Sequence, residues 1–316
     1  MVTRIVLASP RGYCAGVERA IDAVEEALER FGAPVYVRRE IVHNAHVVRS
    51  LAERGAVFVE NEQDVPEGAL VVFSAHGVAP SVHANAASRG LQTIDATCPL
   101  VLKVHAEARR FAADGFTVLL IGHAGHDEVV GTIGEAPDSI VLVESVEDAE
   151  DVSVPDPERV AYITQTTLSV DETAEIAAVL RRRFPAIAWP KKEDICYATS
   201  NRQRAVKGLV ESVDLVLVIG SANSSNSNRL VEVARSRGVP AFLIEDETAI
   251  DERWLEDAEI VGLTSGASVP ESLVARVLDW FAERGVSDVH TRPHLPETVT
   301  FSRPVELRRA AVASAS

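Results

Sequence analysis

The chain has 316 residues, of which 47% are hydrophobic and 25% are charged, as in a globular protein with enough apolar material for its own cores. Its formal net charge of −16 leaves no basic footprint for nucleic acid or an anionic membrane. No signal-peptide pattern and no apolar run of the roughly 18 residues of a membrane span are present. We therefore expect a cytoplasmic protein that binds neither nucleic acid nor membrane.

The first predicted helix begins at a cysteine between two glycines, in SPRGYCAGVERAI. Apolar residues recur at helical spacing after Cys14, and a β-branched strand follows over 35–37. A polar loop then carries His43, 29 residues after the cysteine. A later strand ends in the loop SAHGVAP, which carries His76.

The same order of elements follows Cys98. A helix leads to the strand TVLLIG, and the next loop, GHAGHDE, carries His126 and Glu128 at 28 and 30 residues from the cysteine. A further strand, VAYIT, ends at a second polar loop with Thr166. The chain thus repeats one pattern of helix, strand and polar loop.

A third copy of the pattern starts at Cys196. The strand LVLVIG leads into GSANSSNSN, where Asn226 lies 30 residues after the cysteine and follows Ser224 and Ser225. The strand IVGLTS then ends in a loop with Ser268. All three copies place polar side chains after strands, where open α/β sheets bind ligands.

These repeats predict three similar α/β lobes, each with a small, mainly parallel sheet. Arranged around a pseudo-threefold axis, the lobes would bring the three cysteines to one point, with an iron–sulfur cluster at the centre. We expect the lobes at 14–97, 98–193 and 194–284, with the N-terminal strand of 1–13 added to the third, and a C-terminal segment and disordered tail at 285–316.

Three widely spaced cysteines without a C-x-x-C pair fit neither a disulfide framework nor a zinc ribbon. Structural zinc normally has four protein ligands, and iron–sulfur clusters that only transfer electrons have four cysteines. Three cysteines on a [4Fe-4S] cluster leave one iron open for Lewis-acid chemistry. Taken singly, each cysteine could instead be a buried hydrophobe, each histidine a satisfied loop residue, and SSNSNR a helix cap, but the repeat register favours one shared pocket.

The chain also resembles the 4-hydroxy-3-methylbut-2-enyl diphosphate reductase (LytB) family. Ten segments carry the resemblance, in order along nearly the whole chain: PRGYCAGVERAI, REIVHNAHVV, FSAHGVAP, DATCPLV, IGHAGHDEVVGT, ITQTTLSVDET, DICYATSNRQ, GSANSSNSNRL, LTSGASVPE and VTFSRPVELR. One departure is Asp127, where many family members have proline.

The resemblance implies a role for each residue that the repeats align. Cys14, Cys98 and Cys196 would hold an iron–sulfur cluster, one per chain, whose open iron takes the substrate hydroxyl. The remaining aligned residues would surround the diphosphate and the carbon chain: His43, His76, His126, Glu128, Thr166, Ser224, Ser225, Asn226 and Ser268.

Removal of an allylic hydroxyl needs two electrons and two protons, and gives isopentenyl or dimethylallyl diphosphate, the last step of the methylerythritol phosphate route to isoprenoids. We expect Glu128 to be the proton donor, with Thr166 orienting it or the substrate hydroxyl. The electrons require a partner such as ferredoxin or flavodoxin. An acidic chain needs a local basic patch to dock such a partner, and the sequence pattern does not locate it.

Two other functions compete with this interpretation. A dehydratase of the quinolinate synthase kind also uses three cysteines and an open iron, but the segments GSANSSNSN and ITQTTLS argue against it. A non-enzymatic metal or redox sensor would hold zinc or a labile cluster and switch a partner. Such a sensor has no use for nine polar residues around an open iron.

Overall fold

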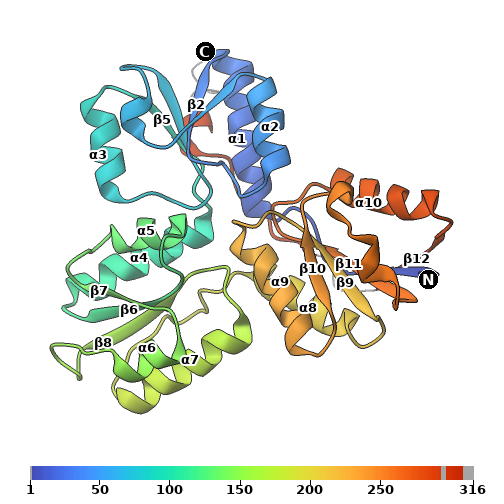
Figure 1. Cartoon of the computed structure of the whole chain (residues 1–316). Helices are drawn as coiled ribbons and strands as arrows, with labels where there is room; N and C mark the ends of the chain where they lie inside the picture. The colour runs from blue at the N-terminus through green and yellow to red at the C-terminus, as the bar shows by residue number, and fades with distance from the viewer. Residues whose placement is uncertain (1, 293–296, 309–316) are drawn as a thin grey trace. The chain divides into compact units, whose positions relative to one another are not determined.

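The computed structural model describes residues 2–292 and 297–308, which form three parallel β-sheets with helices packed on them (Figure 1). The chain separates into two compact units, which we describe one at a time. The one-sheet unit consists of Met1–Ala15, His43–Val47 and Tyr197–Thr300. The two-sheet unit consists of Gly16–Val42, Val48–Cys196 and Phe301–Ser316.

The one-sheet unit is built on a five-stranded parallel sheet. In spatial order its strands are β10 (Ala241–Ile244), β9 (Leu215–Ile219), β11 (Ile260–Ser265), β1 (Arg4–Leu7) and β12 (Asp288–Thr291). Its helices are α8 (Tyr197–Leu209), α9 (Ser225–Ser236) and α10 (Glu271–Glu283), with the short 3₁₀ turns η2 (Glu247–Ala249) and η3 (Glu252–Leu255).

The interior strand β9 lies between β10 and β11, and all five of its residues are buried and apolar. Leu215, Leu217 and Ile219 pack with α10, whereas Val216 and Val218 point to the opposite face and pack with α8 and α9. Because successive side chains alternate between faces, a strand covered by helices on both sides needs apolar residues at every position.

The two-sheet unit contains a four-stranded and a three-stranded parallel sheet. In spatial order, the first has β3 (Ala56–Val59), β2 (Val35–Arg38), β4 (Leu70–Phe73) and β5 (Gln92–Asp95). The second has β7 (Ile140–Val143), β6 (Thr117–Ile121) and β8 (Val160–Thr164).

Helices cover both sheets of this unit. Those in the first half of the chain are α1 (Ala15–Phe31), α2 (Ala45–Glu53), η1 (Glu62–Asp64) and α3 (Pro80–Ser88). Those of the second sheet are α4 (Pro99–Ala113), α5 (Asp127–Ile133), α6 (Val146–Asp151) and α7 (Val170–Arg183). On β6, Leu119 and Ile121 pack with α6 and α7, and Val118 and Leu120 pack with α4 and α5.

The three-lobed α/β fold expected from the repeats is confirmed, since three parallel sheets alternate with helices in the predicted order. Each cysteine precedes a helix and then a strand, giving α1–β2, α4–β6 and α8–β9. Each polar loop after these strands opens a second helix and strand. The sequence pattern therefore predicts both the fold class and the order of elements.

The N-terminal and C-terminal segments of the chain belong to different units. β1 and β12 both belong to the five-stranded sheet, whereas the carbonyls of Ser302 and Leu307 accept hydrogen bonds from Arg19 and Arg30 of α1. Of the tail over 308–316, predicted to be disordered, Arg308 instead lies in a helical turn, and 309–316 lies outside the described residues. The bounds of the three lobes and of the C-terminal segment remain predictions. None of the helices within the described ranges is long and apolar enough to cross a membrane.

Candidate functional site

The three cysteines occupy equivalent positions at the starts of helices. Cys98 is the N-cap residue of α4, and Cys14 and Cys196 directly precede the first residues of α1 and α8. All three are partly exposed, and none of them forms a disulfide in the described part of the chain. A helix N-terminus favours negative charge, so each position suits a thiolate ligand.

Each cysteine is also anchored through its backbone N–H in the same way. The acceptors are the carbonyls of Ala267 for Cys14 (3.2 Å), Ala75 for Cys98 (3.0 Å) and Thr166 for Cys196 (3.0 Å). Each acceptor lies two residues beyond the end of its strand: β11, β4 or β8. The second polar loop of each repeat thus fixes the cysteine that opens the next repeat, a link that sequence spacing alone did not reveal.

This donor set fits an iron–sulfur cluster. Thiolates are the usual cluster ligands, and the three cysteines are partly exposed, lie at helix starts and are anchored by their backbone N–H groups to strand ends. Nothing in the described geometry engages them in a competing disulfide.

Glu128, the one carboxylate among the predicted site residues, is buried, with 2% of its surface exposed. It lies in the first turn of α5, and Thr166, just after β8, donates to it twice: the backbone N–H at 2.6 Å and the hydroxyl at 3.0 Å. Burial raises the pKa of Glu128 to about 7, although both Thr166 bonds act to lower it. A carboxyl group with such a pKa can hold and release a proton at neutral pH.

Two histidines pack together at the start of α5. His126 is the N-cap of α5 and accepts the Glu128 N–H at Nδ1 (3.2 Å), which leaves its ring proton on Nε2. The His76 ring packs edge-on against it, with centroids 5.9 Å apart. The loop after His76 requires a glycine: Gly77 has a φ of +81°, and a Cβ there would lie 3.0 Å from the His105 ring and 3.1 Å from Val101.

Asp127, the departure from the family pattern, takes part in this cluster. Its carboxylate forms an ion pair with Arg39 and lies 3.9 Å from Nδ1 of His76. Ser74 Oγ lies 3.4 Å from the same nitrogen. The aspartate thus lies between a histidine and a guanidinium and contributes a negative charge to both.

In the one-sheet unit, His43 and Ser268 are in direct contact. The Ser268 hydroxyl donates to the His43 carbonyl at 2.9 Å, and His43 Nδ1 lies 3.4 Å from the side-chain amide of Asn223. The preceding residue, Ala267, is the carbonyl that holds Cys14. The loop of Ala267 and Ser268 therefore contacts both the His43 backbone and the Cys14 backbone.

The start of α9 supplies the remaining predicted residues. Ser224 caps the helix by accepting from the N–H of Ser227, so part of the helix-cap reading of SSNSNR is correct. Asn226 accepts the Ala267 N–H at 2.9 Å and donates to the Thr199 hydroxyl at 3.3 Å. Asn226 thereby holds the residue whose carbonyl accepts the Cys14 N–H. Ser225 is half-buried at the first position of the helix.

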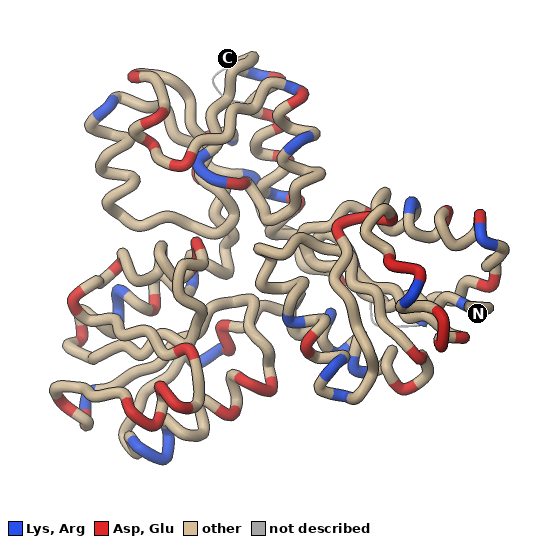
Figure 2. The backbone as a smooth tube through the Cα atoms, viewed as in Figure 1, with Lys and Arg blue, Asp and Glu red and all other residues tan. Residues whose placement is uncertain are grey.

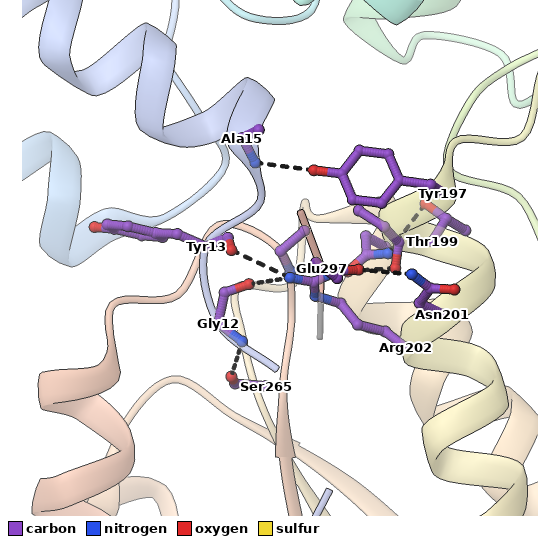
Figure 3. A network of polar contacts seen from close by, with 12 residues as sticks. Gly12, Tyr13, Ala15, Tyr197, Thr199, Asn201, Arg202, Ser265 and Glu297 are labelled. Atoms are coloured by element: carbon purple, nitrogen blue, oxygen red, sulfur yellow. Dashed lines mark hydrogen bonds and ion pairs between the residues drawn. The ribbon is translucent and has the colours of Figure 1, made fainter. Parts of the chain in front are cut away.

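A fully buried arginine completes the surroundings of Cys14 (Figure 3). Arg202 of α8 donates through Nη2 to the carbonyls of Gly12 (2.7 Å) and Tyr13 (3.2 Å), and through Nη1 to Glu297 (3.2 Å). On the other side of the cysteine, the Ala15 N–H donates to the hydroxyl of Tyr197 at 3.1 Å. The backbone on both sides of Cys14 is therefore fixed by side chains of α8.

Comparison with known proteins decides the family. The model of the LytB protein family matches residues 5–282. The chain belongs to the LytB protein family. The resemblance inferred from the ten sequence segments is therefore confirmed.

Relatives within the LytB family are similar over nearly the whole chain. A protein of Acidothermus cellulolyticus named 4-hydroxy-3-methylbut-2-enyl diphosphate reductase is 62% identical over 307 residues, which cover 97% of this chain and 90% of that protein. A protein of the same name from Streptomyces avermitilis is 59% identical, with coverage of 97% and 91%.

Solved structures agree with the family. The E-1-hydroxy-2-methyl-but-2-enyl-4-diphosphate reductase of Plasmodium falciparum has a TM-score of 0.95 and 36% identity, with all of both chains covered. A second structure, titled as (E)-4-hydroxy-3-methyl-but-2-enyl diphosphate reductase, the terminal enzyme of the non-mevalonate pathway, has a TM-score of 0.64 and 31% identity, covering 90% of this chain and 100% of that one.

Sequence reasoning missed two arginines of the LytB chain. Arg39 directly follows the strand β2, the kind of position that marked the other site residues. Arg202 lies on the apolar stripe of α8 with Ala198, Ala205 and Val206, and a charged residue on such a stripe indicates a buried ion pair. Both signals were present in the pattern.

Proposed function

We propose that the protein is a 4-hydroxy-3-methylbut-2-enyl diphosphate reductase that removes the allylic hydroxyl to give isopentenyl and dimethylallyl diphosphate, the last step of the methylerythritol phosphate route to isoprenoids. The reaction consumes two electrons and two protons and releases one water. The proposal rests on three hydrogen bonds of Thr166: its carbonyl accepts one from Cys196, and its backbone N–H and hydroxyl donate to Glu128. Thr166 thereby connects a candidate cluster ligand to a candidate acid. Membership of the LytB family supports the proposal.

Cys14, Cys98 and Cys196 would hold one [4Fe-4S] cluster per chain. When bound, the cluster supplies electrons one at a time and an open iron with Lewis acidity. The protein's part is to fix the three helix starts, which it does through the carbonyls beyond β11, β4 and β8 and, for Cys14, through Arg202 and Tyr197.

Glu128 is the proposed proton donor. Its carboxyl group is buried, its pKa near 7 leaves about half of it protonated at pH 7, and Thr166 binds both of its oxygens. An acid that is already oriented loses little further freedom as the reaction proceeds. Thr166 is a positioning residue in this scheme, because it would act on the substrate by holding Glu128 in place.

The diphosphate would be bound by His43, His76, His126, Ser224, Ser225, Asn226 and Ser268. Hydroxyl, amide and imidazole groups with the N-terminal N–H groups of α9 are suitable donors to phosphate oxygens. Ser224 uses part of its hydrogen-bonding capacity in the helix cap, and Asn226 uses part of its own in the bond to the Ala267 N–H. These bonds restrict the motion of both side chains. We propose a cytoplasmic enzyme that receives electrons from ferredoxin or flavodoxin.

The test uses anaerobically purified protein, reduced methyl viologen and the allylic diphosphate. We expect turnover that is lost on exposure to air, and a loss of at least about 100-fold in kcat for Glu128→Gln at equal cluster content. Glu175→Gln, an exposed change in α7, is the matched control. No turnover by cluster-replete wild type would reject the proposed function, and near-normal turnover by Glu128→Gln would reject the assignment of the acid.

A further inference from the structure

A basic segment stands out in this acidic chain. Residues 181–192 read RRRFPAIAWPKK, with five arginines or lysines and no aspartate or glutamate, in a protein of net charge −16. Figure 2 shows the end of α7 in blue and α6, which packs beside it, in red. None of these twelve residues has a role in the site described above.

Part of this charge is used locally. Arg182 forms an ion pair with Glu150, and Arg183 donates to the carbonyls of Ala149 and Val152. Lys191 and Lys192 are exposed, and neither has an ion-pair partner in the part of the chain that the structure describes. Their charges are therefore available to an approaching molecule.

The exposed lysines border a cavity of about 340 Å³ between α7 and the chain before α8. Trp189, 51% exposed, forms one wall and stacks on Tyr162, with ring centroids 6.3 Å apart. The guanidinium of Arg181 lies 4.7 Å from the centroid of the tryptophan ring. An exposed tryptophan that contacts an arginine beside a cavity is typical of an interface hot spot rather than of a protein core.

The carboxylates facing this cavity are Glu193 and Asp194. Asp194 is buried and already bound, at 2.9 Å by Nζ of Lys103 and at 2.9 Å by the N–H of Thr164. Only Glu193 remains exposed against Arg181, Lys191 and Lys192. The surface is thus locally positive.

This surface is tied to two candidate cluster ligands. From Ala188 onward the chain runs beside β8: Ala188 bridges to Ala161, and Cys196 donates to Thr166. Lys103, five positions after Cys98, also donates to the carbonyls of Lys192 (2.7 Å) and Glu193 (2.9 Å). The basic segment therefore leads along the chain to Cys196, and Lys103 hydrogen-bonds it to the helix that follows Cys98.

We propose that Arg181, Trp189, Lys191 and Lys192 form a docking surface, here called the basic groove, for an acidic one-electron carrier protein. The inference rests on the proposed function, whose two electrons must come from outside the chain. Each docking would oxidise one reduced carrier by one electron, so one turnover consumes two carriers together with two protons. A carrier of the same sign as the enzyme is repelled elsewhere, and a local patch of opposite charge steers it to one place.

The experiment compares two electron sources on the same cluster-replete enzyme: a purified acidic ferredoxin, and reduced methyl viologen, which needs no docking surface. The variants are Lys191→Glu/Lys192→Glu and Trp189→Ala. Arg204→Glu/Arg237→Glu, two exposed arginines of the one-sheet unit, changes the net charge equally and is the control.

We expect the lysine variant to lower kcat/KM for ferredoxin at least about tenfold and to flatten its salt dependence, with methyl viologen turnover within about twofold of wild type. Trp189→Ala should raise KM for ferredoxin at unchanged viologen turnover. Unchanged ferredoxin kinetics, an equal loss with both reductants, or the same loss in the arginine control would overturn the docking surface. Absence of viologen turnover in wild type would instead reject the proposed function.

Discussion

Thr166 binds the Glu128 carboxylate with both of its donors, the backbone N–H at 2.6 Å and the hydroxyl at 3.0 Å. The same residue accepts the backbone N–H of Cys196 at 3.0 Å. One loop residue beyond β8 thus positions the candidate acid and the candidate metal ligand together. A displacement of this loop would disturb both groups at once.

The pKa of Glu128 predicts how activity depends on pH. Because the proton donor must be protonated, kcat/KM should be flat at mildly acidic pH and fall as the pH rises through about 7. The measurement is kcat/KM with reduced methyl viologen between pH 6 and 8.5. A profile without a falling limb in this range would contradict the assignment.

The same shift predicts a pH-dependent gain in stability for Glu128→Gln. Burial raises the pKa from 4.5 to about 7, so the favourable contribution of the neutral acid is complete below pH 4.5 and is lost as the pH rises through 7. The cost of the buried charge above pH 7 is about 3 kcal/mol. Relative to wild type, the cluster-free variant should gain unfolding free energy on going from pH 5 to pH 8. Equal dependence in both proteins would refute the burial argument.

The hydroxyl of Thr166 should tune this titration. It donates to the charged carboxylate and so lowers the pKa of Glu128. Thr166→Val keeps the shape and the backbone bond but removes this donor, so the falling limb should move to higher pH by up to about one unit. Thr166→Ser retains a hydroxyl and should leave the limb in place. A shift to lower pH in the valine variant would show that another group controls the profile.

Much of the fold followed from periodicity, because three copies of helix, strand and polar loop are visible in the sequence. The positions of Cys14, Cys98 and Cys196 at helix starts followed from the same pattern. Their anchoring to the preceding sheet did not, because a backbone hydrogen bond between distant loops leaves no mark in side-chain spacing. The role of Asp127 also required the structure, since its partner Arg39 is 88 residues away.

Arg202 should control the stability and the reactivity of the Cys14 loop. It has no exposed surface and holds the carbonyls of Gly12 and Tyr13, so Arg202→Met leaves them unpaired beside Glu297. Breaking one side of a buried ion pair costs about 3–5 kcal/mol. In cluster-free protein, alkylation followed by mass spectrometry should show faster labelling of Cys14 than in wild type.

Cys98 provides the internal comparison for that experiment, because the described bonds of Arg202 do not include its loop. Arg204→Met, an exposed change on the same helix, should leave the labelling of Cys14 unchanged. Equal acceleration at Cys14 and Cys98 in Arg202→Met would indicate general unfolding and contradict a local role.

The stability of the start of α9 should depend on Gly220 and Gly266, because both glycines lie directly against Ser227. Ser227 has no exposed surface, and a Cβ on Gly266 would collide with its hydroxyl oxygen but stay 3.2 Å from its Cβ. A Cβ on Gly220 would collide with that oxygen and also lie 2.5 Å from the Ser227 Cβ. Gly266→Ala and Gly220→Ala should each cost about 1–3 kcal/mol of unfolding free energy, measured by denaturant unfolding of cluster-free protein.

Ser227→Ala separates the two cases, because it removes the oxygen and keeps the Cβ. It should rescue Gly266→Ala in a double-mutant cycle and fail to rescue Gly220→Ala. Since Ser224 and Asn226 stand in the same turn, only the rescued protein should regain its affinity for the diphosphate substrate. Rescue of both glycine variants, or of neither, would mean that the serine oxygen is not what fixes this helix start.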